Sequence, residues 1–396
     1  MAPLIVETGT PPTDRPPPGA GRLATTILIG SLANSALAAG RFAFPLVALN
    51  LGASTAFVGL MASLYTLPPM LLSIRFGQLV DRVGTRTPAL FACSLIIASA
   101  AAFLAVPLAM TLLLSACLVG TGAVFGHVAA TQAVSEKGAS QRTTRNIGYL
   151  VVGYALFQFL APVASGYVFQ HMGQRAAVMV VGAIGVLACL GLVSGYHRFR
   201  SQIGRPRAPS RRSGGLDLLR IGEMRRWVVV NGVFAAINTI YPLVVSLYAV
   251  EIGLPPAQAG LLLGGFAAGA VTSRLIVPVV VGRIPAPRII LAALLVTAAG
   301  YALIPTTASF WPLIAISALI GFALGNGAPI SQTVIQEVAP EGRVNESLGL
   351  CMAVTNFLQA VIPLTMGIVA GSLGVAAMIL ALAAIALVST ILAVRR

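Results

Sequence analysis

Twelve apolar stretches, separated by short polar breaks, follow one another along most of this 396-residue chain. A helix needs about 20 apolar residues to cross the roughly 30 Å hydrocarbon core of a bilayer. The pattern predicts spans near residues 24–49, 56–76, 88–106, 109–133, 147–170, 176–196, 227–250, 257–281, 288–305, 309–335, 347–370 and 373–393. We therefore expect an all-α integral membrane protein with twelve transmembrane helices.

The composition agrees with a chain that is surrounded by lipid. Hydrophobic residues make up 57% of it and charged residues 9%, whereas a soluble domain carries about 25% charged residues. This excludes a disordered chain and a water-soluble enzyme of several domains. The four cysteines lie within apolar runs, so we interpret them as small buried hydrophobic residues rather than as a disulfide framework.

Two polar segments divide the sequence. Residues 1–22 contain six Pro and no apolar block, which predicts a short disordered tail. Residues 197–226 hold nine Arg against Asp217 and Glu223, and they separate a first half, 23–196, from a second half, 227–396. This linker is either a solvated cytoplasmic loop or a segment that binds anionic lipid. The linker does not combine its basic residues with interleaved aromatic residues or with the signature of a nucleic-acid-binding fold, so we do not expect it to bind nucleic acid.

The distribution of Lys and Arg predicts the orientation. If both termini and the linker share one side, that side receives Arg15, Arg22, Arg82, Arg86, Lys137, Arg142, Arg145, the nine linker Arg, Arg283, Arg288, Arg343, Arg395 and Arg396. The other side receives Arg175. We expect both termini to be cytoplasmic, in a bacterial-type inner membrane.

The two halves repeat each other at an offset of 201 residues. Beyond several Gly pairs, the matched residues are Glu136 with Glu337, Arg142 with Arg343, Gln158 with Gln359, and Pro162 with Pro363. Matches between polar residues and prolines at one constant offset indicate a duplicated unit of six spans in parallel.

A loop motif joins this repeat to a known family. The segment after the second span contains Gly77, Asp81, Arg82, Gly84 and Arg86. It resembles the Gly-x-Leu-Ala-Asp-Arg-x-Gly-Arg-Lys loop of the major facilitator superfamily, whose members consist of two six-helix halves that rock about a central solute site. The resemblance implies that this loop latches the halves on the cytoplasmic side.

A second motif lies in the fifth predicted span. Ala161, Pro162, Ser165 and Gly166 are similar to the Gly-Pro-x-x-Gly-Gly signature of drug–proton antiporters within that superfamily. This resemblance implies a proton-coupled exporter.

Two ionisable residues lie deep inside predicted spans, where they indicate function. Arg41 stands about 17 residues into the first span, with Asn34 on the same helical face, and can bind a carboxylate or phosphate. His127 is the one residue inside the predicted spans whose type has an unperturbed pKa near neutrality, and it is a candidate for the coupling proton. Arg41 can instead snorkel, and His127 can be a neutral residue between helices. We expect Arg75 and Arg274 to snorkel at cytoplasmic helix ends.

Other polar residues in the predicted spans either line a central cavity or join helices. They are Gln158, Asn231, Asn238, Tyr241, Asn326, Gln332, Asn356 and Gln359.

These features predict a monomeric secondary transporter of a small organic solute. The sequence has no nucleotide-binding loop, no zinc-spaced ligand set and no nucleophile–base pair, so we expect no enzyme activity, cofactor or metal. The fifth-span motif favours export of a drug or metabolite in exchange for protons. Arg41 and the lack of intramembrane carboxylates favour uptake or exchange of an organic anion. A transport-dead sensor or scaffold on the same fold is a remote alternative.

Overall fold

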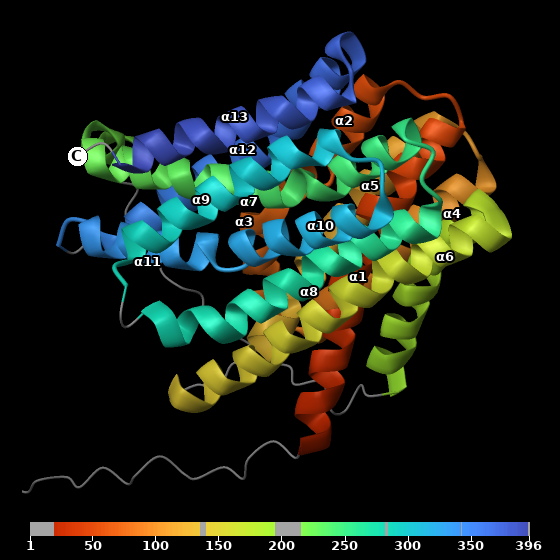
Figure 1. Cartoon of the computed structure of the whole chain (residues 1–396). Helices are drawn as coiled ribbons and strands as arrows, with labels where there is room; N and C mark the ends of the chain where they lie inside the picture. Colours follow the sequence, from red (N-terminus) through yellow and green to blue (C-terminus); the bar gives the residue numbers. More distant parts are fainter. Residues whose placement is uncertain (1–19, 135–139, 195–214, 282–283, 342, 395–396) are drawn as a thin grey trace, which may run out of the picture.

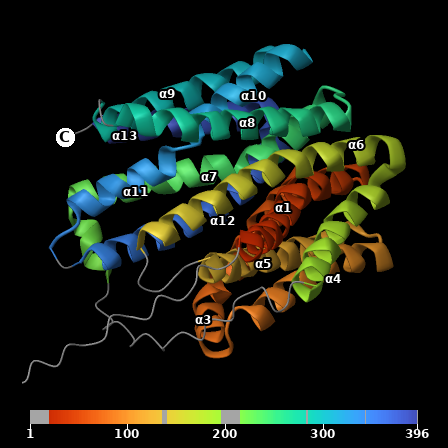
Figure 2. The ribbon, with the colours of Figure 1, turned by 90° about the horizontal axis from the view of Figure 1, so that it is seen from below.

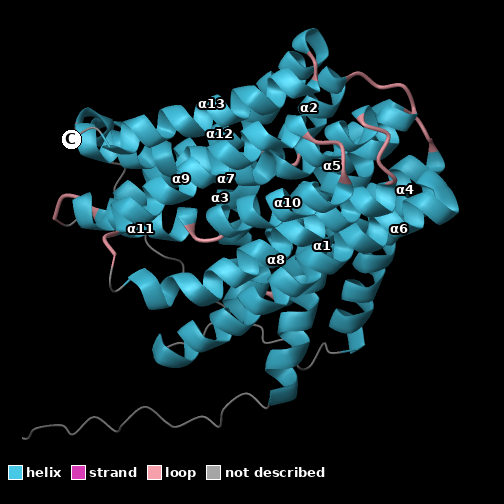
Figure 3. Ribbon diagram, viewed as in Figure 1, coloured by secondary structure: helices cyan, strands magenta, loops and turns pink. Residues whose placement is uncertain are grey.

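A computed structural model describes residues 20–134, 140–194, 215–281, 284–341 and 343–394. In these ranges the chain is helical, with short connecting loops and no strand (Figures 1 and 3). The first half contains α1 (Ala20–Asn50), α2 (Thr55–Leu64), α3 (Leu67–Val83), α4 (Arg86–Ala105), α5 (Ala109–Val134) and α6 (Ser140–Ser194). The second half contains η1 (Gly215–Arg220), α7 (Gly222–Glu251), α8 (Pro256–Val281), α9 (Ala286–Leu303), η2 (Ile304–Thr306), α10 (Phe310–Leu324), α11 (Gly327–Val338), α12 (Val344–Leu373) and α13 (Val375–Val394).

The predicted all-α membrane architecture is confirmed. Eleven helical segments of the described chain are long and apolar enough to span a bilayer. One of them, α6, contains two spans, because Gly173 leaves the helical conformation with φ of 83° and kinks it. Its repeat partner Gly374 has φ of 91° and separates α12 from α13. Glycine adopts positive φ without steric cost, so both turns end a span at equivalent positions.

Two pairs of consecutive helices each form one span that is interrupted in its middle. The second predicted span is divided into α2 and α3 around Tyr65, and the tenth into α10 and α11 around Asn326. Backbone groups at such interruptions lose their helical partners and must find others.

Several predicted boundaries differ from the structure, including those at the two polar segments. Helix α1 begins at Ala20, inside the predicted tail, whose residues 1–19 lie outside the described ranges. Helix α7 begins at Gly222, before its predicted start at Trp227, and η1 also lies within the predicted linker. Helix formation therefore continues past the apolar stretch into charged sequence, because the hydrophobic pattern reports burial in lipid rather than helix length.

The two halves lie side by side. Helices α1, α4 and α5 gather on one side of the bundle and α8, α9 and α10 on the other (Figure 2). Contacts between the halves are concentrated in the pairs α2–α12 and α6–α8, with α1 against α7 near the centre. We call the two outer pairs the seams.

Both seams are built from equivalent residues of the repeat. A Cβ on Gly59 would lie 2.8 Å from the carbonyl oxygen of Pro363, and a Cβ on Gly260 would lie 2.7 Å from that of Pro162. Such distances exclude any side chain, so each glycine brings backbone directly against backbone. These contacts lie near the end of the bundle that carries loops 51–54 and 252–255, which we call the loop end. The halves are therefore closed together at the loop end.

At the opposite end, which we call the linker end, an ion pair fixes η1 to α12. Arg343 donates from Nη1 and Nη2 to the two carboxylate oxygens of Asp217, at 2.8 and 2.9 Å, and from Nε to Glu346 at 2.6 Å. The guanidinium holds the pKa of Asp217 below its ordinary value, and the two carboxylates raise the pKa of Arg343.

Candidate functional site

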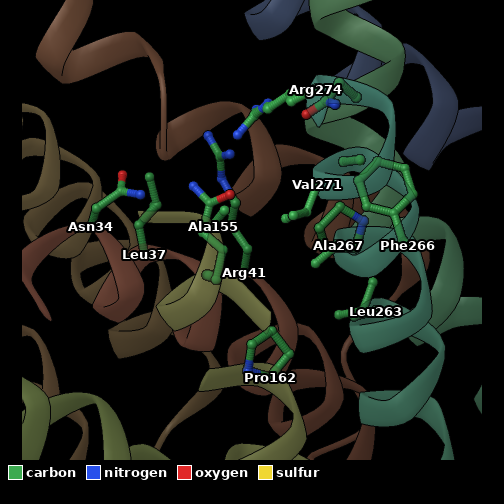
Figure 4. A pocket seen from close by; sticks show the side chains of 15 residues that line it. Asn34, Leu37, Arg41, Ala155, Pro162, Leu263, Phe266, Ala267, Val271 and Arg274 are labelled. Atoms are coloured by element: carbon green, nitrogen blue, oxygen red, sulfur yellow. The ribbon is translucent and has the colours of Figure 1, made fainter. Parts of the chain in front are cut away.

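A cavity of about 160 Å³ lies between the two halves. Its walls come from α1 and α6 of the first half and from α7 and α8 of the second (Figure 4). The cavity is comparable in size to one that holds benzene in a protein core. Its polar side chains are Asn34, Arg41, Gln158, Asn238 and Arg274, and apolar residues including Leu37, Pro162, Leu263, Phe266 and Val271 form most of the remaining surface.

Arg41 enters the cavity from α1. Its Cζ lies 5.9 Å from the centroid of the Tyr65 ring, at the interruption between α2 and α3. The Tyr65 hydroxyl donates to the carbonyl of Gly40 at 2.9 Å, which fixes the ring beside Arg41. Nε of Arg41 is buried and has no hydrogen-bond partner among the described residues. The guanidinium thus has an aromatic neighbour and no described carboxylate to neutralise it.

Arg274 was not among the predicted site residues. We expected it to lie close enough to a helix end to snorkel, and the structure shows that it lines the cavity and reaches from α8 into the same space as Arg41 (Figure 4). Its Nε donates to the carbonyl of Gly325, at 3.4 Å, where α10 gives way to α11. The signal was its depth: Arg274 precedes the end of α8 at Val281 by seven residues, or about 10 Å.

Three carboxamide side chains complete the polar lining. Asn34 lies with Arg41 on one face of α1, as their seven-residue spacing predicts. Gln158 comes from α6 and Asn238 from α7. Carboxamides both donate and accept hydrogen bonds, so they can orient a solute without adding charge.

Several other predicted site residues join helices instead. Asn231, one of a predicted pair with Asn238, donates to Thr355 at 2.9 Å and to Sγ of Cys351 at 3.1 Å, which fixes α7 to α12. Gln359 donates to the carbonyl of Ala235 at 3.3 Å between the same helices. The sequence could not separate these roles, because α7 is packed on several sides, so residues on one face of it contact different neighbours along its length.

Tyr241 stands behind the cavity wall. Its hydroxyl donates to Ser317 at 2.6 Å, and its ring stacks on Phe266 with centroids 4.3 Å apart. Phe266 itself lines the cavity. Tyr241 therefore supports the wall rather than forming it.

The remaining predicted polar residues lie away from this cavity. Asn326 donates to Ser273 at 3.1 Å and borders a separate, mainly apolar cavity of about 210 Å³ among α8, α9, α10 and α11. Gln332 on α11 and Asn356 on α12 are partly buried and are not among the cavity-lining residues. The ring of His127 lies 5.2 Å from that of Tyr154 and does not line the cavity either.

The two sequence motifs fall at different places. In the loop motif, Gly84 has φ of 81° and turns the chain into Arg86, the first residue of α4. Gly77, Asp81 and Arg82 belong to α3, but their side-chain surroundings lie outside the described part of the structure. The latch therefore stays a prediction.

In the α6 motif, Pro162 lines the cavity, while Ala161 and Ser165 are buried. Gly166 lies against the carbonyl of Pro256 in the α6–α8 seam. Each of these placements is explained by helix packing.

Comparison with known proteins identifies the family. The family model of the Major Facilitator Superfamily matches residues 26–236 and again residues 226–396, one match for each half. The chain belongs to the major facilitator superfamily. Membership supports a transporter rather than an enzyme. A search of curated proteins finds no match.

Solved structures of this superfamily share the fold over almost the whole chain. A crystal structure of the nucleoside transporter NupG has a TM-score of 0.75 and 12% identity, over 93% of this chain and 98% of NupG. A crystal structure of a peptide transporter has a TM-score of 0.72 and 16% identity, over 94% and 93%. A bacterial homologue of the human lysosomal transporter Spinster, inward-facing and unoccupied, has a TM-score of 0.73 and 14% identity, over 96% and 97%. At such identities the likeness extends to the fold alone.

Proposed function

We propose that this superfamily member carries a small organic anion across the membrane by alternating access between its halves. The main support is Arg41, whose guanidinium lies in the cavity between the halves without a described carboxylate partner. A permanent charge inside a membrane protein is costly unless something compensates it. A carboxylate or phosphate on the solute provides that compensation. The proposal follows the organic-anion alternative of the two that the sequence left open.

The arrangement of the halves also supports alternating access. The seams close the halves at the loop end, which supports entry of the solute from the linker end. The excess of Lys and Arg at the linker end supports a cytoplasmic position for it. On this proposal the closed loop end corresponds to an inward-facing state, and rocking of the halves about the cavity then opens the loop end.

Proton-coupled export stays a second prediction. The α6 motif that favours it places Pro162 at the cavity and Gly166 in a seam, and both roles serve any coupling mode. His127, the expected proton carrier, stands apart from the cavity beside Tyr154. The geometry therefore gives the anion hypothesis the stronger support.

Transport by purified protein in liposomes tests the proposal. Uptake of radiolabelled carboxylates and phosphomonoesters is measured with and without an imposed pH gradient. We expect saturable uptake of at least one organic anion, which Arg41→Gln reduces at least tenfold. Arg41→Lys restores charge without the fork of donors, so we expect partial activity. Arg225→Gln removes one exposed positive charge from the start of α7 and serves as the matched control.

Two outcomes argue against the proposal. If Arg41→Gln transports at the wild-type rate, Arg41 does not bind the solute. If cationic or neutral solutes are transported and anions are not, the solute class is wrong. Uptake that follows the proton gradient and depends on His127 would instead support proton-coupled transport.

A further inference from the structure

The cavity brings together two guanidinium groups from opposite halves of the protein. Arg41 reaches it from α1 and Arg274 from α8 (Figure 4). The other polar groups among its described lining residues are the carboxamides Asn34, Gln158 and Asn238, which carry no charge. Both guanidiniums are permanently ionised, so two like charges share one space between the halves.

Neutral groups hold both arginines in place. Arg41 stands over the Tyr65 ring, and Nε of Arg274 donates to the carbonyl of Gly325. The interruption between α10 and α11 leaves that carbonyl free of its helical partner. The adjacent pair, Asn326 donating to Ser273, fixes the same two helices one residue further along. Arg274 thus gives one of its five N–H donors to the backbone and retains its terminal nitrogens for a ligand.

The ion pairs that the described part of the structure defines, between Arg226 and Glu223 and between Arg343 and its two acidic partners, do not include Arg41 or Arg274. The charge in the cavity therefore has no described counterpart within the protein. A solute with a single negative charge leaves one of the two guanidinium charges uncompensated. A guest with two negative charges neutralises both guanidiniums and contacts both halves at once.

We infer that the solute is a compact dianion, whose two negative charges are compensated by Arg41 from one half and by Arg274 from the other. This inference rests on the proposed function and adds to it the substrate class. Two kinds of molecule share the required chemistry, a dicarboxylate and a phosphate-bearing solute. The cavity volume of about 160 Å³ suits a small molecule of either kind.

Binding to the purified wild-type protein, measured by isothermal titration and by ligand-dependent thermal shift, tests the inference. The probes are succinate, succinamate and inorganic phosphate at pH 7.5. Succinamate has nearly the shape of succinate, with one carboxylate replaced by a carboxamide. We expect succinate or phosphate to bind at least tenfold more tightly than succinamate. The dianion that binds more tightly distinguishes a dicarboxylate from a phosphate-bearing substrate.

Variants assign the two charges. In Arg274→Gln we expect succinate and succinamate to bind with equal affinity, because one guanidinium remains for one carboxylate. Arg41→Gln should give the same equality, and Arg225→Gln should leave the wild-type preference intact. Arg274→Lys retains the positive charge, so we expect it to retain a preference for succinate. This variant checks that the effect of Arg274→Gln comes from the lost charge and not from loss of folding.

The inference and the proposed function can fail separately. If wild type binds succinate and succinamate equally and both require Arg41, the protein is an anion transporter and the dianion inference is wrong. If Arg274→Gln retains a tenfold preference for the dianion, Arg274 does not bind the second charge. If none of the three probes binds saturably, the inference is overturned, while anion uptake into liposomes decides the proposed function independently.

Discussion

Tyr241 illustrates how a residue outside the cavity can determine its shape. Its ring is buried and stacks on Phe266, and the edge of Tyr301 meets it with centroids 6.2 Å apart. Its hydroxyl donates to Ser317, which in turn donates to the carbonyl of Leu313 at 2.7 Å. The wall of the cavity is therefore supported by an aromatic cluster that is anchored to α10.

This arrangement predicts different effects for two substitutions of Tyr241. Tyr241→Phe retains the stacked ring, and Ser317 retains its bond to Leu313, so we expect a loss of about 0.5–1.5 kcal/mol in the free energy of unfolding and near-normal uptake. Tyr241→Ala leaves a void, which costs about 3–5 kcal/mol, and lets Phe266 move, which raises the KM of uptake. Denaturant unfolding and uptake kinetics measure both. Equal effects of the two substitutions would contradict this account.

The two cavity arginines show which roles of single residues can be predicted from the sequence and which cannot. Arg41 stood out because its span is apolar on both sides of it, so no nearby end offered an escape for the charge. Arg274 was assigned to a helix end because the sequence does not reveal that it lines a cavity or that the carbonyl of Gly325 lies within its reach. Contacts between segments that are far apart in the sequence depend on how the helices pack, and the sequence alone does not show that packing.

At the scale of helices, the two seams predict that Gly59 and Gly260 respond in the same way to substitution. Gly59→Ala and Gly260→Ala each place a methyl group against a proline carbonyl of the other half. Overpacking of this kind costs about 1–3 kcal/mol, so we expect each variant to shift the balance away from closure at the loop end by about fivefold or more. Distances between spin labels across the loop end measure the shift.

A matched control is available on α12. Gly349 has open space around its position, so Gly349→Ala should leave the label distances unchanged. A large difference between Gly59→Ala and Gly260→Ala would argue against equivalent seams.

The ion pair between η1 and α12 predicts a pH dependence. Arg343 lowers the pKa of Asp217, so its stabilising contribution is complete above the ordinary aspartate pKa of about 3.9 and is lost as pH falls through the lower folded-state value. We expect Asp217→Asn to lower the melting temperature slightly at pH 7 and at pH 5. The difference from wild type should disappear at a pH below the folded-state pKa. A difference that is already gone at pH 5 would contradict the assignment.

The helices themselves were largely predictable, and their interruptions were not. The hydrophobic pattern located the spans, since about 20 apolar residues are needed wherever a helix crosses lipid. The pattern is silent about the α10–α11 interruption, because an apolar run reads the same whether its helix is continuous or broken. The turns at Gly173 and Gly374 are an exception. The two glycines match at the repeat offset of 201 residues, and both have a positive φ.

For the whole molecule, orientation is the first property to test. The positive-inside pattern predicts that the linker lies in the cytoplasm and the loop end outside. In a variant without native cysteines, we expect Leu254→Cys to react with a membrane-impermeant thiol reagent in intact cells. Ser213→Cys in the linker should react after the membrane is permeabilised. The reverse pattern would invert the orientation and with it the side from which the cavity loads.

The glycine seams have a thermodynamic consequence for the transport cycle. Where backbone meets backbone, closing the halves immobilises no rotamer-rich side chain, and hence loses little side-chain entropy. Small residues also bury little apolar area, so the gain on closing is small as well. Because the entropy lost and the apolar burial gained on closing are both small, the two conformations stay close in free energy. A difference of a few kcal/mol in the solute's affinity for the two conformations is then sufficient to reverse their populations.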